Sequence, residues 1–131
     1  MTDAPRFSRT DDLALADIED ASKGFGDALI RTPLALAPAL SQQFGCTLHL
    51  KLENLQHANS FKARGAFTKL SALTDAERAR GVIAMSAGNH AQGVAYHAAR
   101  MGIPATIVMP ATTPFSKVER TRQFGARVVL E

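Results

Sequence analysis

Hydrophobic and polar positions repeat in a regular order through the second half of the chain. Short apolar runs without alternation are typical of strands buried on both faces of a parallel sheet. The stretches between them have helical periodicity, and each helical stretch is followed by a glycine suited to ending it. The order predicts parallel strands joined by right-handed crossovers. The predicted strands cover 82–85, 105–109 and 127–130, and the predicted helices cover 90–101 and 114–124, with Thr113 as cap of the second helix and Pro114 as its first residue.

The first half is less regular. The stretch 47–53 alternates strictly between apolar and polar residues, which predicts a strand. Residues 1–14 are polar and aperiodic, and we expect a loose tail there. Three helices are predicted, over 17–29, over 37–44 with Gly45 at its end, and from a capping box of Thr74 and Glu77 to Gly81.

One further helix carries a lysine in an unusual position. Ser60 is predicted to cap it, and apolar residues from Phe61 to Leu73 then recur at about 3.6-residue spacing. Lys62 falls in the first turn, at the edge of the apolar face. The helix dipole and partial burial should both lower the pKa of its amine, and a partly neutral lysine is a nucleophile for aldehydes. On position alone, the more ordinary interpretation is a lysine that reaches water from the helix margin.

Composition and charge limit the kinds of partner and compartment that the chain suits. The 131 residues are 46% hydrophobic and 21% charged, which is ordinary for a globular domain, and the net charge is +3. Residues 1–30 carry −4 and the remainder +7, so the basic body suits an anionic ligand. The bases are scattered and there are only eight Phe and Tyr residues, so we predict no nucleic-acid partner. A single cysteine excludes an internal disulfide and suits a reducing compartment. We expect neither a secretory leader nor a membrane span.

The loop after the predicted strand 82–85 is the strongest candidate for a binding site. Ligands of open parallel sheets bind beyond the carboxyl ends of the strands. Residues 86–90 read Ser-Ala-Gly-Asn-His, and small residues let backbone N–H groups approach an anion at the start of the next helix. An ordinary turn capped by Ser86 or Asn89 explains each residue singly, but not the whole loop. The loop matches neither of the common nucleotide-binding motifs.

Other kinds of site find little support. His90 and His97 lie seven residues apart on one predicted helix, but no cysteine or carboxylate pair completes a zinc-ligand spacing. We therefore predict no metal site. His97 is expected at the surface or at the edge of the core. No Ser/His/Asp arrangement can be assembled from spacing alone.

Taken together, the lysine helix and this loop resemble the threonine/serine dehydratases, which are pyridoxal-phosphate enzymes of the tryptophan-synthase-β-like fold, or fold type II. Residues 60–66 read Ser-Phe-Lys-Ala-Arg-Gly-Ala, and residues 86–93 read Ser-Ala-Gly-Asn-His-Ala-Gln-Gly. Supporting stretches lie at 31–34, 51–54 and 108–110, and their order resembles the catabolic type of threonine dehydratase. The resemblance covers about residues 15–131.

The resemblance implies roles for matching residues. Lys62 would bond to the aldehyde of pyridoxal 5′-phosphate and carry protons, Phe61 would pack beside the pyridine ring, and Asn89 would donate to the ring oxygen. The loop Ser86, Ala87, Gly88, Asn89 and His90 would bind the carboxylate of a small amino-acid substrate. The cofactor would act as electron sink. The implied reaction is deamination of L-threonine or L-serine to a 2-oxo acid and ammonia.

The resemblance also implies an architecture. We expect an α/β fold with a parallel open sheet and flanking helices, the three-layer αβα small domain of a fold type II enzyme beside an incomplete large domain. Residues 15–50 would begin the large domain and 51–131 would form the small one. The family's glycine-rich phosphate cradle and its partner for the pyridine nitrogen have no counterpart here. We therefore expect an N-terminal portion that is inactive alone, from a homo-oligomeric cytoplasmic enzyme.

Two alternatives remain open. Relatives that racemise serine carry a second serine at the position of Ala87, and a methyl group cannot transfer a proton. Elimination is therefore expected rather than racemisation, and the context of Phe61 and Arg64 argues against β-replacement. A non-catalytic module that binds a ligand or partner is the alternative from another class.

Overall fold

A computed structural model describes residues 13–131, so the predicted tail at 1–14 lies almost wholly outside the described residues. The body is built on a three-stranded parallel sheet in the order β3 (Val82–Met85), β4 (Ala105–Met109), β5 (Arg127–Leu130). Ala84 pairs with Ile107, which pairs with Val128. The predicted parallel sheet and all three of its strands are confirmed.

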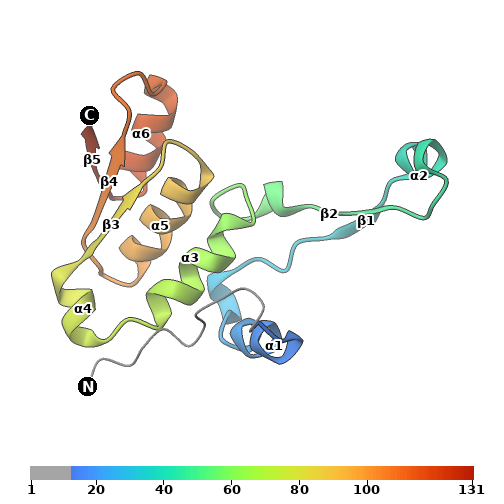
Figure 1. Cartoon of the computed structure of the whole chain (residues 1–131), viewed down its shortest axis with the longest axis horizontal. Helices are drawn as coiled ribbons and strands as arrows, with labels where there is room; N and C mark the ends of the chain where they lie inside the picture. Colours follow the sequence, from blue (N-terminus) through green and yellow to red (C-terminus); the bar gives the residue numbers. More distant parts are fainter. Residues whose placement is uncertain (1–12) are drawn as a thin grey trace.

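Helices cover one face of this sheet (Figure 1). The helix α5 (Asn89–Arg100) lies on β3 and β4, α6 (Phe115–Gln123) lies beside it, and α3 (Lys62–Ser71) packs along α5. Ala63 and Ala66 of α3 are buried and Gly93 of α5 lies against the α3 backbone, and such small residues allow two helix backbones to approach closely. The core below α5 is formed by Ala91, Val94, Ala95, Ile107, Met109, Val118 and Ala126.

The opposite face of the sheet is bare among the described residues. Ile83 is 77% exposed and Met85 is 82% exposed, while the alternate residue Ala84 packs against the core. The prediction that strand 82–85 is buried on both faces is therefore wrong for this chain, which forms a sheet layer and a helix layer. The continuous apolar run could not show that residues 13–131 cover one face only.

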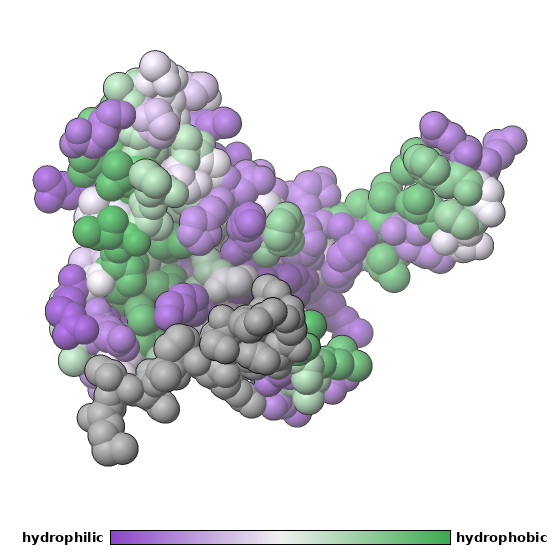
Figure 2. All heavy atoms as spheres, viewed as in Figure 1, coloured by the Kyte–Doolittle hydropathy of each residue, from purple (hydrophilic) through white to green (hydrophobic). Residues whose placement is uncertain are grey.

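An arm projects from the body (Figure 1). It consists of an antiparallel ribbon of β1 (Leu34–Leu36) and β2 (His49–Lys51), with α2 (Pro38–Phe44) at its tip. Gly45 ends α2 with a φ of 65°, as its position predicted. The predicted strand 47–53 is shorter and lies outside the parallel sheet. Hydrophobic surface follows the arm in Figure 2. The side chains of Leu34 and Phe44, both on this arm, are more than 60% exposed.

The remaining elements are α1 (Leu15–Lys23) and η2 (Gly26–Ala28), which precede the arm along the chain, and η3 (Glu53–Leu55) and α4 (Asp75–Arg80), which come between the arm and the sheet. The capping box at Thr74 and Glu77 is confirmed: the Glu77 amide donates to Thr74 Oγ1 at 3.3 Å, and the Thr74 amide donates to Glu77 Oε2 at 2.8 Å. The helix predicted over 17–29 ends earlier, because Gly24 interrupts it.

The start of α6 is displaced by one residue from its prediction. Pro114 occupies the capping position itself, with φ −54° and ψ 134°, and the Thr113 hydroxyl is buried without a hydrogen-bond partner. Across residues 13–131, no helix has the length and apolar character needed to cross a bilayer.

Candidate functional site

The lysine helix begins one residue later than the sequence suggested. Phe61, with φ −60° and ψ −14°, takes the capping position, and α3 starts at Lys62. Ser60 was predicted to cap the helix, but its hydroxyl is buried and makes no hydrogen bond. The cap prediction is therefore wrong, because the preceding loop turns the Ser60 side chain inward, away from the free N–H groups of the first turn.

Lys62 occupies the first turn, as predicted, but its side chain is exposed, so the expected partial burial is wrong for this chain. Its Nζ lies 4.9 Å from the centroid of the Phe61 ring. Phe61 is itself 59% exposed. An amine and an aromatic face are thus presented side by side to the same space.

The loop 86–90 delivers the chain from β3 into α5. The Ser86 amide donates to the Val108 carbonyl at 3.1 Å, and the Gly88 amide donates to Ser86 Oγ at 3.2 Å. Asn89 and His90 are the first two residues of α5 and have no side-chain cap before them. Their N–H groups therefore lack intrahelical acceptors and are suited to an anion.

Gly93 brings the loop and the lysine together. It lies on α5, one turn beyond Asn89, against the backbone of Lys62. A Cβ atom placed on Gly93 would lie 3.1 Å from the Lys62 carbonyl oxygen and 3.3 Å from the Ala63 nitrogen. These distances are shorter than most Cβ contacts, so a residue without a side chain suits this position and lets the start of α3 lie beside the first turns of α5.

A hollow of about 410 Å³ opens at this junction. It brings together Phe61, Lys62 and His90 of the predicted site residues; Ser86, Ala87, Gly88 and Asn89 do not line it. We call it the Lys62 hollow, and its lining is Phe61, Lys62, Arg64, Gly65, Ala66 and His90.

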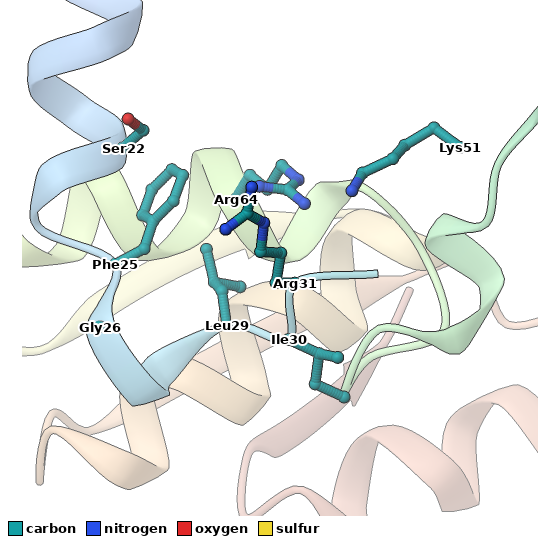
Figure 3. Close-up of a pocket in the computed structure, with 8 residues that line it drawn as sticks. All are labelled: Ser22, Phe25, Gly26, Leu29, Ile30, Arg31, Lys51 and Arg64. Atoms are coloured by element: carbon teal, nitrogen blue, oxygen red, sulfur yellow. The ribbon is translucent and has the colours of Figure 1, made fainter. Parts of the chain in front are cut away.

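A second cavity, of about 460 Å³, is lined by Arg64 together with Lys51 and residues of the segment 22–31 (Figure 3). Arg31, Lys51 and Arg64 point into it from three separate segments, and Phe25 and Leu29 form its apolar wall. The guanidinium of Arg64 lies 5.7 Å from the centroid of the Phe25 ring. Arg64 therefore lines both this cavity and the Lys62 hollow.

Glu53 is the acidic partner in this basic region. Its carboxylate accepts two hydrogen bonds from Arg64, at 2.8 and 2.7 Å, and one from the Thr32 hydroxyl at 2.5 Å. These bonds, led by those from Arg64, and the nearby charges of Arg64 and Lys51 outweigh the effect of burial and lower the pKa of Glu53 to about 2. The carboxylate is thus charged at neutral pH.

His97 is fully buried, so its predicted place at the surface or core edge is wrong. Its ring lies 5.4 Å from that of Phe67 and 5.0 Å from that of Tyr96, and neither ring nitrogen has a hydrogen-bond partner. Desolvation, helped by the charges of Arg100 and His57, lowers its pKa to about 4. His97 belongs to an aromatic core and does not reach the Lys62 hollow.

The contacts of Glu53 were not predicted from the sequence. The supporting stretches 31–34 and 51–54 carried no assigned role there, yet the fold places Thr32, Lys51 and Glu53 around Arg64. Spacing along the chain gives no sign of such a convergence. Within residues 13–131, no cluster of three or more His, Cys, Asp or Glu side chains could hold a metal ion.

Comparison with known proteins gives a consistent result. The sequence profile described as "Pyridoxal-phosphate dependent enzyme" matches residues 26–130. An L-threonine ammonia-lyase of Thermotoga maritima is 51% identical over 119 residues, which are 91% of this chain and 30% of that protein. The chain spans about a third of the length of the curated relatives it matches.

Solved structures of enzymes with related names have the same fold over most of this chain. Threonine deaminase isoform 2 of Solanum lycopersicum superposes with a TM-score of 0.81 at 41% identity, covering 98% of this chain and 35% of that one. Maize serine racemase superposes with a TM-score of 0.82 at 36% identity, covering 88% of this chain and 35% of that one.

Proposed function

This chain belongs to the family of pyridoxal-phosphate dependent enzymes, and from that premise we propose that the intact protein deaminates L-threonine or L-serine to a 2-oxo acid and ammonia. The 51% identity to an L-threonine ammonia-lyase supports this substrate class. The observation that carries the proposal is the junction of Lys62 with the start of α5, where His90 lines the same hollow and Gly93 contacts the Lys62 backbone.

The residues of the Lys62 hollow fit the cofactor. The hollow offers one exposed amine for an aldehyde, one exposed aromatic face for a planar ring, and about 410 Å³ of space. Lys62 would hold the cofactor through its Nζ, and Phe61 would pack against the ring. When bound, pyridoxal phosphate supplies an electron sink for the electrons of the broken Cα–H bond.

The remaining roles follow from the positions of donors and acceptors. The loop 86–90 would bind the substrate carboxylate, chiefly through the N–H groups of Asn89 and His90, because these lack intrahelical acceptors and the dipole of α5 favours an anion there. The Asn89 amide would donate to the cofactor's ring oxygen. The Lys62 amine would move the α-proton, since an amine that lines the hollow can accept a proton and return it.

Serine racemisation is the second candidate, and similarity to maize serine racemase favours it. Ala87, half-buried in the loop, argues against it because a methyl group cannot exchange a proton on the opposite face of the substrate. Elimination therefore remains our proposal. The non-catalytic alternative predicts no reaction at Lys62 at all.

We further propose that residues 15–50 begin the large domain and 51–131 form the small one, and that the intact enzyme is a cytoplasmic homo-oligomer. The projecting arm supports the division, since β1 and β2 pair only with each other among the described strands.

The test uses the intact protein with pyridoxal phosphate. We expect a cofactor absorbance band near the visible edge, borohydride fixation of the cofactor on Lys62, and production of 2-oxo acid from threonine. Lys62→Ala should remove all three, with at least a thousandfold loss of kcat because the proton carrier is gone.

Lys69→Ala is the matched control, because Lys69 lies on the same helix, outside the Lys62 hollow. A chiral assay of residual serine separates elimination from racemisation. Deamination that survives Lys62→Ala would refute the proposal, and D-serine as the main product would favour the racemase.

A further inference from the structure

The first turn of α3 lacks the usual stabilising features of a helix start. It has no side-chain cap and no acidic residue, and it carries two cations, Lys62 and Arg64. Cations at a helix N-terminus oppose the helix dipole, and uncapped first turns fray. The local sequence therefore does not hold Lys62 in place, and a contact from elsewhere in the fold must do so.

Glu53 supplies a contact of this kind. Its two carboxylate oxygens accept from Nε and Nη2 of Arg64 at 2.8 and 2.7 Å. A two-point contact between a carboxylate and the rigid guanidinium fork fixes orientation as well as distance. Both side chains are more than half buried, with 14% of Glu53 and 33% of Arg64 exposed, so this ion pair is screened less than a surface pair.

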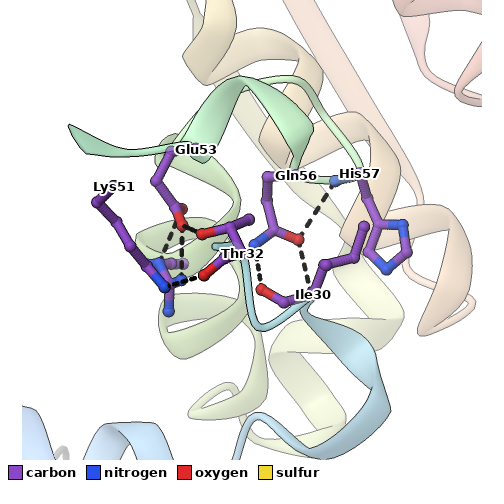
Figure 4. Close-up of polar contacts among 7 residues, drawn as sticks. Ile30, Thr32, Lys51, Glu53, Gln56 and His57 are labelled. Carbon is purple, nitrogen blue, oxygen red and sulfur yellow. Dashed lines mark hydrogen bonds and ion pairs between the residues drawn. The ribbon is translucent and has the colours of Figure 1, made fainter. Parts of the chain in front are cut away.

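Glu53 is itself held on a rigid frame (Figure 4). The Thr32 hydroxyl donates to its carboxylate, and the Lys51 amine donates to the Thr32 carbonyl at 2.5 Å. Close by, the buried Gln56 side chain bonds to both the amide and the carbonyl of Ile30, at 2.8 and 2.9 Å. The segments at 30–32 and 51–56 are therefore joined to each other by hydrogen bonds that do not involve α3.

We propose that Glu53 and Arg64 act as a positioning pair that orders the first turn of α3 and thereby aims the Lys62 amine into its hollow. Arg64 is two residues from Lys62, and its amide donates to the Phe61 carbonyl at 3.0 Å, so a fixed guanidinium restrains the backbone on both sides of the lysine. The role rests on the proposed function of Lys62, but the ordering of the turn is measurable without any reaction.

The first readout is amide hydrogen exchange of residues 63–66 in the intact protein. Arg64→Lys keeps the charge but loses the fork, and Glu53→Gln keeps the shape but loses the charge. Each should accelerate exchange in this turn by about tenfold and leave α5 unchanged. The double variant should resemble either single variant, because one contact is lost in all three.

The second readout is specific to the lysine. Cofactor-free protein is treated with a limiting amount of pyridoxal phosphate and then borohydride, and the labelling of Lys62 is divided by that of Lys69. This ratio should fall about tenfold in both variants, since a frayed turn spreads the amine over many directions. Lys23→Gln, which breaks the exposed pair with Asp20, is the control and should change neither readout.

The outcomes separate this inference from the proposed function. Unchanged exchange and an unchanged labelling ratio in both variants overturn the positioning pair, even if the enzyme deaminates threonine. Absence of Lys62 labelling in the unaltered protein refutes the proposed function, while hydrogen exchange still decides the pair. If Glu53→Gln does not fold, Thr32→Val removes one hydrogen bond from the same carboxylate and should give a smaller acceleration in the same turn.

Discussion

At the scale of single residues, the site depends on a glycine as much as on a lysine. Gly93 contributes no functional group, but its missing side chain lets α5 contact the backbone of Lys62. The neighbouring atoms are backbone atoms of a packed helix, which cannot rotate away as a flexible side chain would.

Gly93→Ala should therefore displace the start of α3. A Cβ 3.1 Å from the Lys62 carbonyl forces a shift of a few tenths of an ångström, and we expect a loss of about 1–3 kcal/mol in the free energy of unfolding. Denaturant unfolding of the intact protein measures this loss, and the affinity for pyridoxal phosphate should fall with it.

Gly24→Ala is the matched control, because the nearest atom to its Cβ lies at an ordinary 3.6 Å and its φ of −78° suits alanine. That variant should change stability by less than about 1 kcal/mol and leave the cofactor affinity as it is. Equal effects of the two substitutions would mean that the contact at Gly93 does not position Lys62.

At the scale of elements, α3 and α5 form the unit that carries the site. Alanines at their interface allow close packing, and the same two helices enclose an aromatic cluster of Phe67, Tyr96 and His97. His97 is buried there in its neutral form, since its pKa is lowered to about 4 from an ordinary value of 6.5.

This burial predicts a dependence of stability on pH. In the unfolded chain His97 takes up a proton near pH 6.5, but in the folded protein only near pH 4. Its contribution is therefore complete above pH 6.5 and is lost as the pH falls through 4, by up to about 3 kcal/mol. His97→Phe keeps an aromatic ring and should remove this part of the slope in urea unfolding between pH 7 and 4.

The exposed His49 on the arm provides the comparison. His49→Gln should leave the pH dependence of the unfolding free energy as it is in the unaltered protein. An unchanged slope in His97→Phe would show that other groups cause the loss of stability in acid.

At the scale of the whole molecule, the body is a sheet with helices on one side and apolar residues on the other. Strand β3 illustrates the asymmetry, since Ile83 and Met85 are largely exposed while β4 buries Ile107 and Met109. An apolar sheet face of this kind is usually covered in a parallel α/β protein.

We predict that Met85→Lys destabilises the intact protein by more than about 2 kcal/mol, because a covered face would bury the new charge. In residues 13–131 expressed alone, the same change should cost less than about 0.5 kcal/mol, since Met85 is 82% exposed there. Ile107→Lys, at a fully buried position, should prevent folding in both. If Met85→Lys is harmless in the intact protein, the face is open in solution.

The parallel strands were predicted to the residue, because short apolar runs between glycine-ended helices leave few alternatives. Caps were predicted less well. Thr74 does cap its helix, with Glu77 as local partner, whereas the hydroxyls of Ser60 and Thr113 turn inward. A helix cap formed by two residues of the same turn can be predicted from the sequence. A cap whose side-chain direction depends on the path of the preceding loop cannot.

The amino-acid sequence by itself determined the order of strands and helices, the family, and Lys62 with residues 86–90 as candidate site, because periodicity and motif are properties of neighbours along the chain. Tertiary structure alone decided that Gly93 contacts Lys62, that Glu53 bonds to Arg64, and that one sheet face is left uncovered by residues 13–131. These facts join residues 11 to 31 positions apart or depend on which surfaces the fold covers, and only packing in three dimensions fixes such relations.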